Sequence, residues 1–98
     1  MEIKAKLKDG ITTVKAMAKH PMLTYDTAKK QGVEANFITH ITATLNDKVV
    51  VLDMSTSQFL SKNPIIKFSF KGAVAGDKLT MTWVDLLGNT ETSDSVVK

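Results

Sequence analysis

The chain has 98 residues, of which 43% are hydrophobic and 23% are charged. This length and balance are typical of one folded domain, and they exclude a wholly disordered, collagen-like or coiled-coil chain. The net charge is +3, yet all thirteen basic residues are lysines, and cysteine is absent. Nucleic-acid recognition is disfavoured because it relies on arginine, and the lack of cysteine excludes disulfides, thiolate metal sites and sulfur nucleophiles.

The sequence also lacks the marks of a membrane or export segment. No apolar run approaches the roughly 20 residues that a bilayer span requires. The first six residues alternate apolar and charged side chains and contain no apolar core of a signal peptide. We therefore expect no contact with a membrane, and we expect export, if it occurs, to depend on another chain.

Residues 2–8 alternate strictly between apolar and charged side chains, which is typical of a half-buried strand. Asp9-Gly10 suits a tight hairpin turn, and apolar and β-branched residues resume over 11–19. We expect these two strands to pair. His20-Pro21 ends the second strand, because proline has no N–H for the ladder.

The segment 23–36 is the most polar part of the chain. It predicts a long connection that crosses between sheets, with a short helical turn at 27–31. Alternation returns over 37–45 and predicts a strand with Ile41 on one side and Ile38 on the other.

Asn46-Asp47 predicts a turn into 48–54, whose β-branched run is typical of a strand covered on both faces. The polar stretch 55–63 interrupts the pattern. Three further strands are predicted at 65–71, 78–86 and 90–97.

Seven short strands at a spacing of about ten residues predict an all-β fold. We expect residues 1–98 to form one domain, a seven-stranded antiparallel immunoglobulin-like β-sandwich of the fibronectin type III or E-set kind. The alternation places aromatic side chains at the centre of its core, namely Phe37, Phe68, Phe70 and Trp83.

Candidate chemistry is sparse. The chain has two histidines, His20 and His40, but neither lies in a short-spaced cluster of ligands, so we expect no metal site and no cofactor. Asp77 and Asp85 are not brought together by the pattern, and no serine lies in a glycine elbow, so we expect no catalytic residue. His40 is expected on a solvent face. His20 has two interpretations, a loop histidine at a strand end or a residue that handles a ligand.

Several short motifs follow one another along the chain: Ile3-Lys4-Ala5-Lys6-Leu7-Lys8, His20-Pro21-Met22, Ser61-Lys62-Asn63-Pro64, Phe68-Ser69-Phe70-Lys71-Gly72-Ala73, Gly76-Asp77-Lys78 and Trp83-Val84-Asp85. In this order and at this spacing they resemble the SoxZ family over nearly the whole chain. That family supplies the small subunit of the SoxYZ sulfur-carrier complex of bacterial thiosulfate oxidation.

The resemblance implies an immunoglobulin-like, non-catalytic subunit that forms a heterodimer, or a higher assembly, with a Y subunit. In that family the Gly-rich tail of the Y subunit carries a cysteine, and sulfur intermediates travel on this cysteine between the Sox enzymes of the periplasm. The resemblance also implies export together with the signal-bearing partner. The residues alone leave an alternative, a free-standing immunoglobulin-like interaction module unrelated to sulfur chemistry.

Two loops are candidates for the surface that binds the Y subunit, because loops on a rigid sandwich commonly carry binding function. The candidate residues are His20, Pro21, Met22, Ser61, Lys62, Asn63 and Pro64, with Phe59 as an apolar anchor. A structural interpretation competes, in which the prolines end or start strands, and Met22 and Phe59 plug the end of the sandwich.

Overall fold

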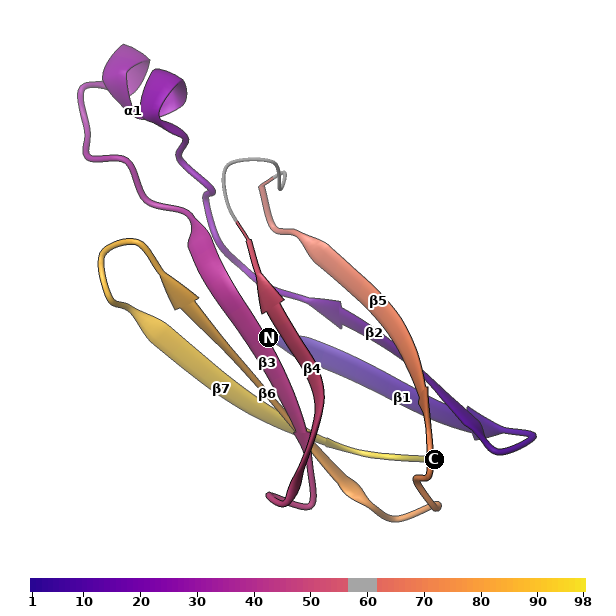
Figure 1. The fold of residues 1–98 in the computed structure, drawn as a ribbon. Coiled ribbons are helices and arrows are strands. Elements are labelled where there is room, and N and C mark those ends of the chain that lie inside the picture. The colour runs from indigo at the N-terminus through magenta and orange to yellow at the C-terminus, as the bar shows by residue number, and fades with distance from the viewer. Residues whose placement is uncertain (57–61) are drawn as a thin grey trace.

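The computed structural model describes residues 1–56 and 62–98, which form two antiparallel sheets and one short helix. The strand order is β1-β2-β5 in the first sheet and β4-β3-β6-β7 in the second. Figure 1 shows the sheets as the two layers of a sandwich, and the expected immunoglobulin-like architecture is confirmed. The elements are β1 Glu2–Lys8, β2 Ile11–Met17, α1 Tyr25–Gln31, β3 Ile38–Leu45, β4 Val49–Ser55, β5 Ile65–Lys71, β6 Lys78–Asp85 and β7 Thr90–Val96.

Two tight turns set the register of their hairpins. Asp9 and Gly10 have φ angles of 52° and 78°, and Asn46 and Asp47 have φ angles of 52° and 58°. Two consecutive residues with positive φ form the turn whose twist matches that of the flanking strands. The predicted pairing of β1 with β2 is confirmed.

The core lies between the sheets and centres on β3 and β6 rather than on β5. Trp83 and Phe37 are buried as expected, with 6% and 5% of their surface exposed. Phe68 and Phe70 differ from the prediction, because they are partly buried and pack against the margin of the core. They lie on β5, an edge strand, where fewer neighbours cover a side chain.

Strand β3 departs from simple alternation. The sequence pattern puts Ile38 and Ile41 on opposite sides, but both are fully buried. The register with β6 skips Thr39, so a β-bulge adds one residue there and reverses the alternation. Thr56, just after β4, bonds to this part of β3, since its N–H donates to the Thr39 carbonyl at 2.8 Å and its hydroxyl donates to the Ile38 carbonyl at 2.6 Å.

Strand β4 contradicts the prediction of a strand covered on both faces. It is an edge strand, and Val49 and Val50 are exposed. A run of β-branched residues reflects strand propensity as well as burial. In β4 it reflects propensity, because no layer of the described chain covers the outer face of this sheet.

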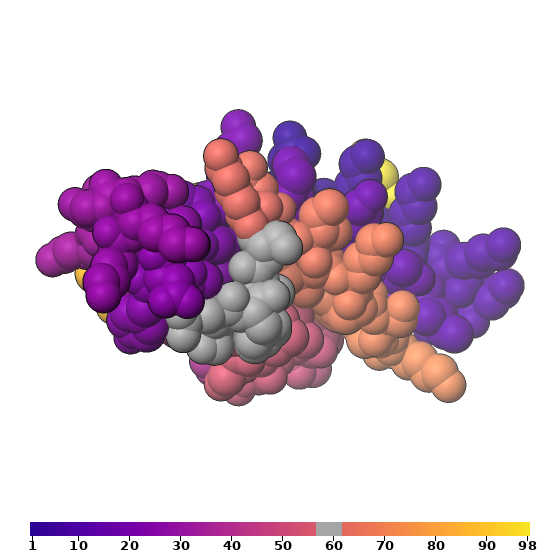
Figure 2. All heavy atoms as spheres, turned by 90° about the horizontal axis from the view of Figure 1, so that it is seen from above, coloured from indigo at the N-terminus to yellow at the C-terminus, as the bar shows by residue number. Residues whose placement is uncertain are grey.

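The connection 23–36 runs from the first sheet to the second, as expected, and carries α1, which is longer than the predicted helical turn. Thr24 caps the helix by accepting a hydrogen bond from the Thr27 N–H at 3.2 Å, and Gly32 ends it in the left-handed conformation. In Figure 2 this connection forms one end of the molecule, opposite the hairpin of β1 and β2. Within the described ranges, no helix is long and apolar enough to cross a membrane.

We predict that Trp83→Ala lowers the free energy of unfolding by about 3–5 kcal/mol, because the cavity it leaves lies in the centre of the core. Val50→Ala is the matched control, and we expect it to change that free energy by less than about 0.5 kcal/mol. Urea denaturation measures both. Equal losses in the two variants would contradict the position of the core.

Candidate functional site

A buried carboxylate lies where β6 ends. Asp85 accepts hydrogen bonds at Oδ2 from His20 Nε2 at 3.0 Å and from Asn36 Nδ2 at 3.0 Å. The backbone N–H of Asn89 donates to Oδ1 at 2.8 Å, and its side-chain amide donates to Oδ2 at 3.2 Å. These donors belong to three loops: the one after β2, the end of the α1 connection and the β6–β7 turn. Asp85 therefore ties three loops together at one end of the sandwich.

Asn36 joins two of these loops directly. Its backbone forms an isolated antiparallel bridge with Leu23, with N–H···O distances of 2.6 and 2.9 Å, which closes the base of the α1 connection. Its side-chain oxygen accepts a hydrogen bond from the Leu87 N–H at 3.3 Å. The connection that carries α1 is thus fixed to the β6–β7 turn through one side chain.

His20 is buried, with 3% of its surface exposed. Its imidazole ring and the indole ring of Trp83 are in edge-to-face contact, with ring centroids 5.1 Å apart. Its Nδ1 accepts the Met22 N–H at 3.0 Å. The proton of the neutral ring is therefore on Nε2, which donates it to Asp85. Both ring nitrogens are occupied by bonds that hold the loop.

The two loops singled out in the sequence meet at His20. Its backbone N–H donates to Asn63 Oδ1 at 3.0 Å, and its carbonyl accepts the Asn63 N–H at 2.9 Å. Met22 and Asn63 both adopt left-handed backbone, with φ angles of 49° and 51°. Such a conformation is costly for methionine, so it persists because the surrounding contacts determine it.

The candidate partner-binding residues divide by exposure. His20, Met22 and Pro64 are buried, whereas Pro21, Lys62 and Asn63 are exposed. Phe59 and Ser61 lie outside the described residues. A surface formed by these loops would therefore consist of the exposed members, with the buried ones holding them in place.

The sequence interpretation missed three residues of this network: Asp85, Asn36 and Asn89. Asp85 appeared as part of a motif without a partner, although Asp-x-x-Gly-Asn is typical of a turn in which the aspartate accepts backbone N–H groups. No local pattern connects Asp85 with His20, which lies 65 positions away. Their pairing follows from the topology of the two sheets.

Other titratable side chains do not join this network. His40 is partly exposed on the outer face of β3, and its Nε2 lies 2.5 Å from Oδ1 of Asp53 on β4. In the parts of the chain that the structure describes, no three His, Asp or Glu side chains gather in a way that could hold a metal ion.

Two opposing effects act on the ionisation of Asp85. Burial raises the pKa of the carboxyl group, but hydrogen bonds from His20, Asn36 and Asn89 stabilise the charged form and together lower the pKa below its usual value of 3.8. The carboxylate is therefore ionised at neutral pH and serves as the acceptor that holds the loops.

This arrangement has the chemistry of a positioning network. A general base needs a lone pair directed at a substrate, but His20 uses Nδ1 for the Met22 N–H and Nε2 for Asp85. The Asp85 oxygens are likewise directed inward. What the network offers to another molecule is the fixed shape of the loops above it.

One family model, described as sulphur oxidation protein SoxZ, matches residues 1–96. The chain belongs to the SoxZ family. This membership gives the chain a role in the Sox system of sulfur oxidation. None of the curated proteins compared with the chain matches it. The resemblance of the ordered motifs to SoxZ is thus confirmed.

We predict that Asp85→Asn lowers the free energy of unfolding at neutral pH by about 3 kcal/mol, because an amide cannot accept the His20, Asn36 and Asn89 donors together. The matched control is Asp94→Asn, since Asp94 is exposed on β7 and bonds to one hydroxyl. Chemical denaturation followed by tryptophan fluorescence measures both variants.

A comparison of the wild type with Asp85→Asn across a range of pH tests the ionisation of Asp85. Its pKa is lowered on folding, so the unfolded chain takes up a proton first as the pH falls. The stabilisation from the Asp85 carboxylate is fully present above pH 3.8, the usual pKa of an aspartate, and is lost as the pH falls through the lower pKa of the folded state. The stability difference between the wild type and Asp85→Asn should therefore shrink in strong acid. A difference that does not depend on pH would rule out the buried carboxylate as its source.

Proposed function

We propose that this chain is the non-catalytic subunit of a SoxYZ sulfur carrier, which forms a heterodimer with a Y subunit that bears the sulfur-carrying cysteine. Membership of the SoxZ family and the absence of cysteine support this division of labour. A chain without a thiol needs a partner to hold sulfur covalently. The chain stabilises the Y subunit, helps to present its tail to the Sox enzymes, and reaches the periplasm with it.

The proposed interface is the end of the sandwich above the Asp85 network. The observation that supports it is that Asp85, a buried carboxylate, fixes three loops through hydrogen bonds from His20, Asn36 and Asn89. Buried polar networks that are fully bonded make loops rigid, and rigid loops bind with less loss of conformational entropy.

The side chains at this end suit a protein partner. Pro21, Lys62 and Asn63 are exposed there, and Leu86 and Leu87 in the β6–β7 turn expose 42% and 53% of their surface. Figure 1 shows this turn and α1 at the same end of the sandwich. Exposed leucines beside polar groups are typical of an interface with an apolar centre and a polar rim.

Co-expression with the Y subunit, followed by size-exclusion chromatography, tests the pairing. We predict that the wild-type chain elutes with the Y subunit and that Leu87→Glu weakens the complex about tenfold or more, because it places a charge in the apolar centre. Val50→Glu is the matched control, since Val50 is similarly exposed, at 61%, but lies at the start of β4 beside the Asn46-Asp47 turn.

The outcomes separate two claims. A wild-type chain that elutes alone contradicts the heterodimer. A complex weakened by Val50→Glu and not by Leu87→Glu contradicts the assigned end. Fractionation of the same cells tests the route of export, since the chain should reach the periplasm when the signal-bearing Y subunit is present and remain in the cytoplasm without it.

We also predict that the isolated chain gains no mass when it is incubated with thiosulfate, because it has no thiol to form a sulfur adduct. Intact-protein mass spectrometry measures this, with the purified Y subunit as the positive control. A sulfur adduct on this chain would overturn its role as the subunit without a carrier thiol.

A further inference from the structure

The outer face of the first sheet is covered by lysines. Alternation along its strands directs six lysines and one glutamate outward. Paired positions on β1, β2 and β5 form rows that cross the sheet, and the first row begins at Glu2. In the second of these rows Lys4, Lys15 and Lys67 lie directly opposite one another across β1, β2 and β5. The other outward lysines are Lys6, Lys8 and Lys71.

This arrangement works against the stability of the isolated chain. Like charges directly opposite one another in a sheet repel, and none of the six lysines forms an ion pair within the described residues. Lysines on an edge strand can discourage aggregation, but Lys15 lies on β2, the central strand. The free edge of β1 is also covered in part, because its backbone forms two hydrogen bonds with the backbone of Lys98, with N–H···O distances of 2.8 and 3.1 Å. Protection of an edge therefore does not account for Lys15.

The charge of the molecule is unevenly distributed. Six lysines and one glutamate give this face a charge of +5, whereas the whole chain carries +3. The remaining seven lysines and nine acidic residues therefore carry −2. Such a concentration of one sign attracts and orients molecules of the opposite charge.

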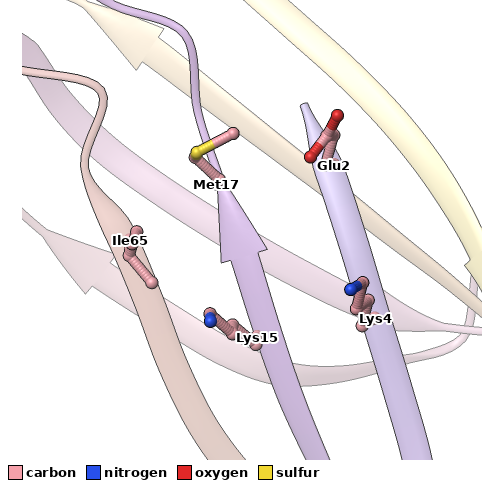
Figure 3. A pocket seen from close by; sticks show the side chains of 5 residues that line it. All are labelled: Glu2, Lys4, Lys15, Met17 and Ile65. Atoms are coloured by element: carbon pink, nitrogen blue, oxygen red, sulfur yellow. The ribbon is translucent and has the colours of Figure 1, made fainter.

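We propose that this lysine face docks the acidic surface of a partner protein. Figure 3 shows part of it, with Glu2, Lys4, Lys15, Met17 and Ile65 around a shallow hollow of about 160 Å³. This volume is well below the roughly 300 Å³ of the smallest typical small-molecule pockets. The face therefore suits contact with the broad surface of another protein better than the binding of a small molecule. Its lysines repeat about 5 Å apart across the strands and about 7 Å apart along them, a spacing that carboxylates on a sheet or helix can match.

The composition of the face favours a protein over a nucleic acid. The chain has no arginine for bidentate phosphate contacts, and no aromatic side chain projects from this face for base stacking. Apolar side chains border the lysines instead, with Met17 and Ile65 at one end and Ile11 at the other. An acidic protein surface would meet the lysines through complementary charge and these bordering side chains through apolar contact.

This inference does not rest on the proposed heterodimer. The lysine face is the flat side of one sheet, whereas the Asp85 network lies at the end of the sandwich. A partner could therefore occupy the lysine face whether or not the Y subunit binds at the end.

Lys15→Glu tests the inference with two readouts. The new carboxylate would lie between Lys4 and Lys67, so we expect the midpoint of thermal unfolding to rise by a few degrees. We expect the same variant to bind a fluorescein-labelled decaglutamate peptide about tenfold more weakly at low ionic strength, as measured by anisotropy. Lys67→Glu, on the edge strand β5, is a second variant with the same expected direction of binding.

Lys30→Glu is the matched control, because it makes the same change of charge on α1, away from the sheet. We expect it to bind the peptide within about twofold of the wild type. Equal weakening by Lys15→Glu and Lys30→Glu would overturn the assigned face, and a lower unfolding midpoint for Lys15→Glu would overturn the argument that Lys15 opposes stability. Tighter binding of decathymidylate than of decaglutamate would overturn the choice of a protein partner.

Discussion

The Asp85 carboxylate is the constraint on which one end of this sandwich depends. A buried charge is costly unless donors surround it, and here donors arrive from His20, Asn36 and Asn89. Each donor belongs to a different loop, so satisfying one carboxylate fixes the relative positions of all three loops. The ring of His20 also packs against Trp83, which connects the loops to the hydrophobic core. The shape of this end is therefore set by the same contacts that stabilise the domain.

Backbone irregularities make this arrangement fit the sheets. The bulge at Thr39 lets both Ile38 and Ile41 face the core, and Thr56 donates hydrogen bonds to the carbonyls of Ile38 and Thr39. The left-handed Met22 turns its N–H toward His20 Nδ1 and its sulfur toward the Ile38 N–H, which lies 3.4 Å away. The bulge and the histidine loop thus meet at one residue, and a change in either would shift the other.

Most of the fold could be predicted from local patterns, but the site could not. Alternation marked the strands, and paired turn residues such as Asp9-Gly10 marked the hairpins. The bulge at Thr39 and the exposure of Val49 were missed, because periodicity does not show where a register shifts or which strand lies at an edge. The bond between His20 and Asp85 was missed for a different reason. It joins residues far apart in the sequence, and its geometry exists only when both sheets are assembled.

The two surfaces proposed for this chain would act over different distances. The charge of +5 on the lysine face extends beyond contact, but salt screens it within about 8 Å at physiological ionic strength. It would therefore orient an acidic partner during the last part of its approach and contribute less after contact, when each exposed ion pair adds little. The loops held by Asp85 offer apolar groups and a fixed shape, which act at contact and resist dissociation. Under the two proposals, one face of the chain would orient an acidic protein, while the other end would retain the Y subunit.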